Sequence, residues 1–189
     1  MATEPSRSTS FWFSCQFQFN DFPKQWELPP EPQRAIACFE TLAQTYLVVM
    51  ARHLVCNTTL PIYLPLGPAA LPTEADNTPT AGATNELFAN KWPPAYFVIN
   101  FAYWTQMSNI QADVTHIPGV RNEWADELSR ESITVLLQKG WDPAKQFKIS
   151  LTEILLPKRG QFFPKDCLHR VPRRVGRFQR WLQTLGAAE

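Results

Sequence analysis

The stretch His116-Ile117-Pro118-Gly119-Val120-Arg121-Asn122-Glu123-Trp124-Ala125-Asp126-Glu127-Leu128-Ser129-Arg130 decides how this chain is expected to fold. Residues 110–116, which lead into it, alternate between apolar and polar side chains, and this alternation predicts a half-buried strand. Pro118-Gly119 then predicts a turn, and Asn122 is well placed to cap a helix that follows. The expected strand, turn and helix carry a histidine on the loop and a carboxylate near the start of the helix.

That histidine and carboxylate, His116 and Asp126, suit metal-assisted phosphodiester chemistry, in which an oxygen ligand holds Mg²⁺ and a mobile histidine assists proton transfer or product departure. The pattern His, Pro-Gly, Asn, Ala-Asp, Leu-Ser-Arg resembles the end of the ribonuclease H domain of retrotransposon-type reverse transcriptases, in the RNase H-like superfamily. The resemblance extends over residues 11–130. It implies an α/β fold with a mixed β-sheet flanked by helices, and it implies further carboxylates upstream.

Glu40 is the first of these carboxylates. Residues 33–54 are predicted to form a helix whose buried stripe consists of Ile36, Phe39, Ala43, Tyr46, Leu47 and Met50. Glu40 lies within or beside that stripe, where an ionised carboxylate is costly unless it is paired or bound to a cation. Taken alone, the position of Glu40 favours a side chain that lies at the edge of the stripe or that pairs with Arg34 or His53. The resembled family has a catalytic Glu followed by a small residue in its first helix, and Glu40-Thr41-Leu42-Ala43 matches that pattern.

Asp76 is the second. Asp76-Asn77-Thr78-Pro79 precedes a predicted helix over residues 79–90, with Thr78 as its cap and Pro79 in its first position. An isolated Asp-Asn pair indicates only a turn with a cap. In the resembled family, however, an aspartate ends the central strand and is followed by Asn or Ser and a helix, which assigns Asp76 as a metal ligand. Residues 94–104 are predicted to form a helix whose aromatic side chains belong to the core rather than to a base-stacking platform.

The resemblance implies that Glu40, Asp76 and Asp126 converge on Mg²⁺ (or Mn²⁺) while His116 assists near the departing product. Oxygen ligands without paired Cys or His favour magnesium over zinc. The implied reaction is two-metal hydrolysis of the RNA strand of RNA/DNA hybrids. The residues expected to contact the nucleic acid are Asn77, Thr78, Arg121, Asn122, Arg173, Arg174 and Arg177.

The family's first catalytic aspartate, on its opening strand, has no counterpart in this sequence. Residues 11–19 alternate with period two and predict an aromatic strand, with a short return strand from Trp26, but only Glu4 precedes them and Asp21 follows them. We therefore expect a first strand that is missing or truncated and a nuclease that is partial or degenerate. The alternatives are a catalytically inactive, retroelement-derived nucleic-acid-binding or scaffold protein, and another enzyme of the same fold such as a recombination nuclease. The Ala-Asp-Glu-Leu-Ser-Arg sequence argues against the last.

Length and charge predict one domain with appendages in this chain of 189 residues. The expected parts are a disordered leader over 1–10, the RNase H-like domain over 11–131 and a C-terminal extension over 132–189. Residues 157–181 of the extension include eight Lys or Arg and a single acidic residue. This basic helical tail is therefore a candidate nucleic-acid contact. The alternative is a solvated helical face. Residues 178–185 have an apolar helical face that can dock on the body or on a protein partner.

The cysteines and the termini indicate the compartment. The four cysteines are widely spaced and indicate neither a zinc site nor a disulfide framework. The sequence has no signal-peptide pattern and no apolar run of membrane-spanning length. We therefore expect an intracellular protein, cytoplasmic or nuclear, whose partner is an RNA/DNA hybrid or another nucleic acid and not a membrane.

Overall fold

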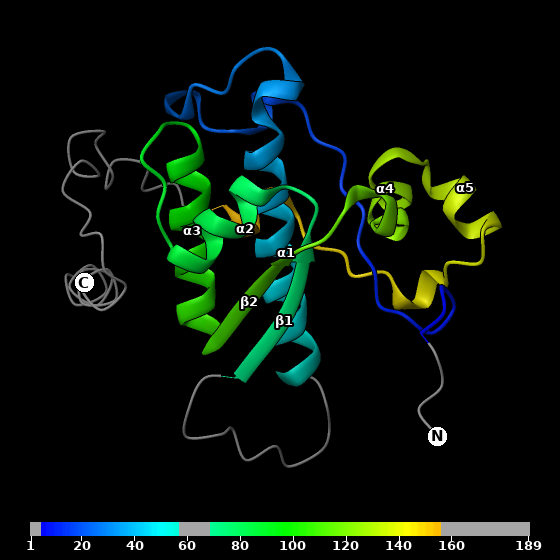
Figure 1. Ribbon diagram of the computed structural model, residues 1–189. Helices are drawn as coiled ribbons and strands as arrows, with labels where there is room; N and C mark the ends of the chain where they lie inside the picture. The colour runs from blue at the N-terminus through cyan, green and yellow to red at the C-terminus, as the bar shows by residue number, and fades with distance from the viewer. Residues whose placement is uncertain (1–4, 57–68, 156–189) are drawn as a thin grey trace.

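The computed structural model describes residues 5–56 and 69–155 and shows a mixed α/β fold (Figure 1). Within these ranges no helix is both long enough and apolar enough to cross a membrane. The basic tail, the three arginines at 173, 174 and 177, and the apolar face over 178–185 lie outside the described residues. The helices and strands are α1 (Ile36–Cys56), β1 (Ala69–Ala75), α2 (Thr78–Glu86), α3 (Pro94–Ser108), β2 (Ile110–His116), α4 (Glu123–Arg130), α5 (Ile133–Gln138) and α6 (Leu151–Ile154).

The two strands run parallel, with Ala69 opposite Ile110 and Ala75 opposite His116. Parallel neighbours need a long crossover connection, and α2 and α3 provide it here. The strand, turn and helix predicted around His116 therefore form, as do the long helix that carries Glu40 and the aromatic helix over 94–104. The prediction of an α/β fold is confirmed at this level, with a sheet of two strands in the described part of the chain.

Side-chain amides occupy both outer edges of this sheet. The Asn85 side chain of α2 takes the place of a strand beside β2, because its Nδ2 donates to the carbonyl of Val114 (2.8 Å) and its Oδ1 accepts from the Val114 N–H (2.9 Å). On the other edge, Gln44 Nε2 of α1 donates to the carbonyl of Glu74 (2.9 Å). Polar backbone groups that a strand leaves open are thus satisfied by side chains.

Pro72 suits the outer edge of β1 for a related reason. Ala69 N donates to Asn109 O and Ala75 O accepts from Ile117 N, so the odd-numbered residues of β1 direct their backbone groups toward β2. Alternate residues face opposite ways in a strand, which turns Pro72 toward the outer edge. Proline has no N–H and is tolerated at such an edge because no ladder bond is lost there. The edge is therefore poorly suited to continuous pairing with a further strand.

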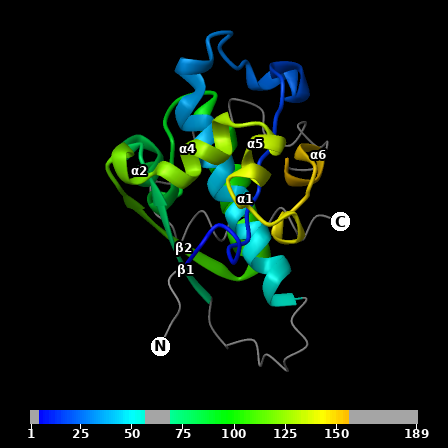
Figure 2. The ribbon, with the colours of Figure 1, turned by 90° about the vertical axis from the view of Figure 1, so that its right-hand side faces the viewer.

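Helix α1 passes through the middle of the molecule, with α2 and α6 on opposite sides of it (Figure 2). It is covered on several sides, so its burial is wider than the single predicted stripe. Ile36, expected inside, is 45% exposed, whereas Cys38, Leu42 and Val49 are buried. The main cluster joins α1 to α3, α6 and the turns before α1, and its largest side chains are Phe22, Trp26, Leu42, Tyr46, Tyr96, Phe97 and Ile154. The aromatic residues of α3 therefore belong to the core, as predicted.

The predicted aromatic strand over residues 11–19 is wrong. This segment is extended, but it makes only one isolated bridge, between Trp12 and Gln146, and it ends in a 3-10 turn at Phe19–Asp21. The predicted return strand at Trp26 is a second 3-10 turn, Lys24–Trp26. Neither segment pairs with β1 or β2, so the period-two pattern does not form a strand of the sheet. Trp12 is buried instead, while Phe11 stays exposed beside Lys145.

A second, smaller cluster lies around α4 and α5, apart from the helices that cover the sheet (Figure 1). Trp12, Leu136 and Trp141 form its core, and Trp124 and Leu128 pack against it. Residues 5–12, α4, α5 and the turn as far as Gln146 are called the α4–α5 unit below. Residues 5–10, expected in a disordered leader, form a turn here, because Arg7 binds Glu127 of α4 with Nε–Oε1 and NH2–Oε2 distances of 3.0 and 3.2 Å.

Two of the predicted helix caps differ in detail. Asn122 is the N-cap residue of α4 and Asn77, rather than Thr78, is that of α2, but neither side chain bonds to the backbone of its helix. Helix α2 begins at Thr78 and ends at Glu86, four residues before its predicted end, because Leu87 adopts a left-handed conformation with φ of 49°. The polar side chains at these caps are therefore available for other contacts.

Candidate functional site

Glu40 and Asp76 lie together where β1 ends and α2 begins. Gln44, one turn after Glu40 on α1, bonds to the carbonyl of Glu74, and this contact holds that face of α1 against the end of β1. Asp76 follows β1 directly, and a side chain built on Gly119 would place its Cβ 3.8 Å from Asp76 Oδ2. The turn after β2 therefore lies against Asp76, and α1 brings Glu40 to it from the other side.

Burial raises the pKa of Glu40, and the neighbouring Asp76 carboxylate raises it further. Hydrogen bonds from Thr80 and Asn77 act in the opposite direction and favour the ionised form. Glu40 Oε2 and Asn77 Oδ1 are both buried and have no hydrogen-bond partner among the described residues. Arg34, one of the two partners considered for Glu40, pairs with Glu31 instead. Two carboxylates thus lie together without a cation among the described side chains, and the Asn77 amide donates to one of them.

Replacing Glu40 by glutamine is expected to stabilise the fold at pH 7 by roughly 1 kcal/mol. The raised pKa means that ionising Glu40 opposes folding once the pH exceeds its ordinary value of 4.5. The gain of Glu40→Gln should therefore shrink as the pH falls below about 4.5. Urea unfolding at pH 7 and pH 3.5 measures it, and Glu31→Gln, at an exposed position, is the matched control. A loss of stability at pH 7 would contradict the raised pKa.

His116 lies near the Glu40–Asp76 pair, whereas Asp126 is paired with Arg130 on α4. His116 is exposed at the end of β2, opposite Ala75 and thus beside the residue that precedes Asp76. Asp126 lies on α4 and its Oδ1 is 3.1 Å from Arg130 NH2, with 47% of its side chain exposed. Within residues 5–56 and 69–155 no group of three His, Cys, Asp or Glu is close enough to hold a metal ion. The structure brings Glu40 and Asp76 together and leaves Asp126 paired with Arg130.

The expected nucleic-acid contacts surround this pair in part. Asn77 lies beside Glu40, and Thr78 is exposed in the first turn of α2. Arg121 is exposed in the 3-10 turn Gly119–Arg121, next to Asn122. Arg121 thus places one positive charge on the same side of the fold as the turn that contacts Asp76.

Sequence reasoning missed two polar residues of this site, Gln44 and Thr80. Thr80 is fully buried, and its hydroxyl lies 3.4 Å from the Ala37 carbonyl and bonds to Glu40. Gln44 is also buried, one turn after Glu40. The sequence does contain a signal for Gln44, because a polar residue on the apolar side of a helix needs a hydrogen-bond partner. Finding it required knowing which side of α1 faces the sheet.

The donor set fits a hard divalent cation. Carboxylate and amide oxygens are the ligands that Mg²⁺ and Mn²⁺ take, and the orphaned Glu40 Oε2 and Asn77 Oδ1 are oxygen atoms of this kind. Asp76 adds a second carboxylate beside Glu40. These three residues suit one cation with water completing its shell, and a second cation requires a further carboxylate.

This chain matches no protein-family model, no curated protein and no solved structure. Its function is therefore inferred from its own residues and their arrangement.

Proposed function

We propose that this protein is a ribonuclease H-like domain of retrotransposon origin that hydrolyses the RNA strand of RNA/DNA hybrids with Mg²⁺ or Mn²⁺. The observation that carries the proposal is the pairing of Glu40 with Asp76 at the end of β1, next to the end of β2 where His116 lies. A buried, partly unpaired carboxylate beside a second carboxylate is costly to the fold, and such costs are concentrated at functional sites.

The order of elements supports the same proposal. A helix carrying Glu40 precedes a strand ending at Asp76, and a second, parallel strand ends at His116 before the helix that carries Asp126. This is the order that the resemblance implies for the catalytic residues. In parallel sheets, side chains that follow the carboxyl ends of neighbouring strands meet at one edge, which is where ligands bind in α/β proteins.

The residues have separate roles in the proposed reaction. Glu40 and Asp76, with the Asn77 oxygen as a further ligand, would hold the cation, which would supply activated water and stabilise the charge of the leaving oxygen. His116 is exposed beside them and can hand a proton to the departing product. Asp126 would serve as a further oxygen ligand only if α4 brought it to this pair, because no third carboxylate lies close enough among the described residues. Arg121 and Thr78 contact the phosphate backbone.

A second candidate function is that of an inactive relative that binds nucleic acid without cleaving it. Two observations favour it: Asp126 is paired with Arg130 rather than grouped with Glu40 and Asp76, and no aspartate precedes the aromatic segment over residues 11–19. Binding requires the positive charges and the shape of the surface, and it does not require the carboxylates.

Cleavage of a labelled RNA/DNA hybrid with and without Mg²⁺ separates the two functions. For the nuclease we expect cleavage of the RNA strand that Asp76→Asn and Glu40→Gln each abolish, while Asp113→Asn, at an exposed position on β2, leaves it unchanged. Hybrid binding that weakens with salt, without cleavage by the unsubstituted chain at any Mg²⁺ or Mn²⁺ concentration, would establish the binding protein instead.

A further inference from the structure

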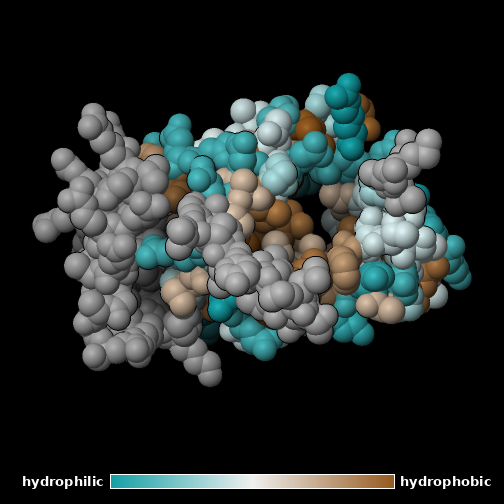
Figure 3. All heavy atoms as spheres, turned by 90° about the horizontal axis from the view of Figure 1, so that it is seen from below, coloured by the Kyte–Doolittle hydropathy of each residue, from teal (hydrophilic) through white to brown (hydrophobic). Residues whose placement is uncertain are grey.

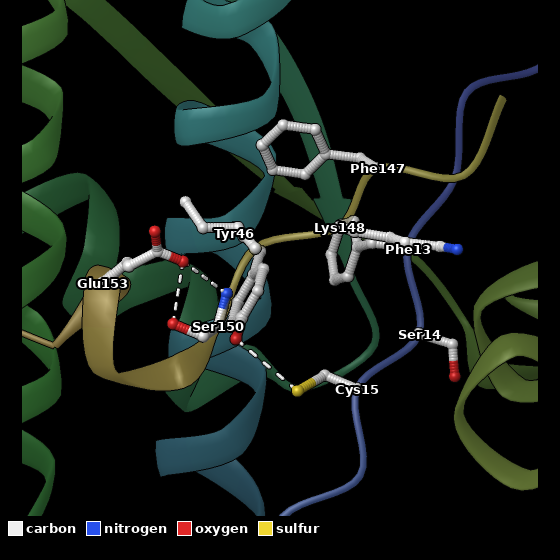
Figure 4. A pocket seen from close by; sticks show the side chains of 9 residues that line it. Phe13, Ser14, Cys15, Tyr46, Phe147, Lys148, Ser150 and Glu153 are labelled. Atoms are coloured by element: carbon white, nitrogen blue, oxygen red, sulfur yellow. Dashed lines mark hydrogen bonds between the residues drawn. The ribbon is translucent and has the colours of Figure 1, made fainter.

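A cavity of about 280 Å³ lies between the aromatic segment, α1 and the segment that leads into α6. The rings of Phe13, Tyr46 and Phe147 line it from these three parts of the chain (Figure 4). Phe13 and Tyr46 are stacked, with ring centroids 5.1 Å apart and planes 20° from parallel. Seen from below, hydrophobic side chains gather around a hollow in the middle of the molecule (Figure 3). The cavity therefore offers aromatic rings set among polar side chains.

The polar groups around the cavity are incompletely used. Glu153 Oε2 accepts from the Ser150 N–H and hydroxyl at 2.8 and 2.7 Å, and Oε1 accepts no hydrogen bond from the described residues. These bonds keep the pKa of Glu153 below its ordinary value, so the carboxylate is ionised and oriented. Lys148 has no ion-pair partner in the described part of the chain and is exposed. The rim therefore offers one acceptor and one cation.

We propose that this cavity binds a nucleotide, with its base against the aromatic rings, a base N–H or amino group donating to Glu153 and its phosphate paired with Lys148. Flat rings stack on aromatic side chains whatever their sequence identity, and carboxylates accept from the donor edges of bases. A phosphate supplies the partner that the Lys148 ammonium lacks.

Tyr46 contributes an edge as well as a face. Its hydroxyl donates to Cys15 Sγ at 3.6 Å, a weak bond that an oxygen or nitrogen of the base can replace. Burial raises the pKa of Tyr46, so the phenol stays protonated and remains a donor. The site does not depend on the proposed nuclease, because none of its lining residues belongs to the group around Glu40 and Asp76.

The test is titration of the ¹⁵N-labelled full chain with AMP, GMP, CMP and UMP, followed by the backbone amide shifts. We expect saturable shifts centred on Cys15 and on residues 147–153, with at least one nucleotide. Lys148→Gln should weaken nucleotide binding about fivefold and leave binding of the matching nucleoside unchanged. Lys91→Gln, which changes an exposed lysine before α3, is the matched control and should alter neither. Phe147→Leu should weaken nucleotide and nucleoside alike, by about tenfold.

Three outcomes overturn the proposal. The first is the absence of saturable shifts with all four nucleotides at millimolar concentration. The second is equal binding of inorganic phosphate alone, because the rings would then contribute nothing. The third is binding that neither Lys148→Gln nor Phe147→Leu weakens while both variants keep a dispersed spectrum, because the nucleotide would then occupy another place.

Discussion

Asn85→Ala is expected to lower the free energy of unfolding by about 2–3 kcal/mol. The change removes both hydrogen bonds that the Asn85 amide makes to the backbone of Val114. Val114 is only 2% exposed to solvent. The N–H and carbonyl of Val114 then lose the partners that stand in for a neighbouring strand. Leaving buried backbone groups unpaired costs more than the bonds themselves contribute, because the groups were already removed from water. Urea denaturation followed by circular dichroism measures the loss.

A second variant at the same position shows that both bonds matter. Asn85→Asp keeps the acceptor for the Val114 N–H but replaces the donor by a carboxylate oxygen that faces the Val114 carbonyl. We expect a loss similar to that of Asn85→Ala at pH 7. The matched control is Asn90→Ala, an exposed asparagine just beyond α2, which should change stability by less than about 0.5 kcal/mol. Equal stability of all four chains would show that the amide does not hold the edge.

Glu127→Gln is expected to destabilise the protein by about 1–2 kcal/mol at pH 7, because Arg7 and Lys139 are each more than a third exposed and water screens their charges. The Glu127 side chain is 11% exposed and lies between Arg7 and Lys139, with the Trp141 indole N–H as a third partner. The hydrogen bond from Arg7 is the main reason why the pKa of Glu127 falls to about 2. Removing the carboxylate leaves Arg7 without its partner, whereas Lys139 keeps Glu131, 3.0 Å from its Nζ.

The pH dependence gives the second signature of Glu127. Because its folded-state pKa lies below its ordinary value of 4.5, its contribution is complete above about pH 5 and is lost as the pH falls toward 2. The difference between the wild-type chain and Glu127→Gln should therefore be largest at neutral pH and shrink in acid. Unfolding midpoints at pH 7, 4 and 2.5 measure it, with Glu123→Gln on the exposed face of α4 as control. A difference that stays constant from pH 7 to 2.5 would contradict the network.

The elements that the sequence predicted well are those fixed by local signals. The alternation over residues 110–116, the Pro118-Gly119 turn and the 3.6-residue period after Pro32 each determine one element without help from the remainder of the chain. The aromatic segment over 11–19 has an equally clear period, but a strand needs a partner edge, and both edges of the sheet are held by amides. The alternating pattern of residues 11–19 can be recognised from the segment alone, whereas pairing as a strand depends on residues elsewhere in the chain.

The candidate site divides in the same way. Glu40 lies on a helix that the sequence pattern predicts, whereas the strand that ends before Asp76 was expected only from the resemblance, so their pairing did not follow from local patterns alone. The position of Asp126 depends on how α4 packs, and α4 packs on Trp141 and on Trp12, which is far away in the sequence. Glu127 was part of the quoted motif, yet its partner Arg7 lies 120 residues away, in a segment expected to be disordered. No local sequence pattern predicts the contact between Arg7 and Glu127.

The α4–α5 unit encloses its own tryptophan cluster and its own ion network, separate from the cluster around α1. It joins the remainder through the chain on either side of it and through the Ser14 hydroxyl, which donates to the Leu128 carbonyl of α4 at 2.9 Å. Units with separate cores open locally with their own free energies, and amide hydrogens in them exchange at their own rates. The free energy of opening the structure around Asp126 is therefore expected to depend on Trp141 and Glu127. The free energy of opening the structure around Glu40 and Asp76 is expected to depend on the central helix and sheet.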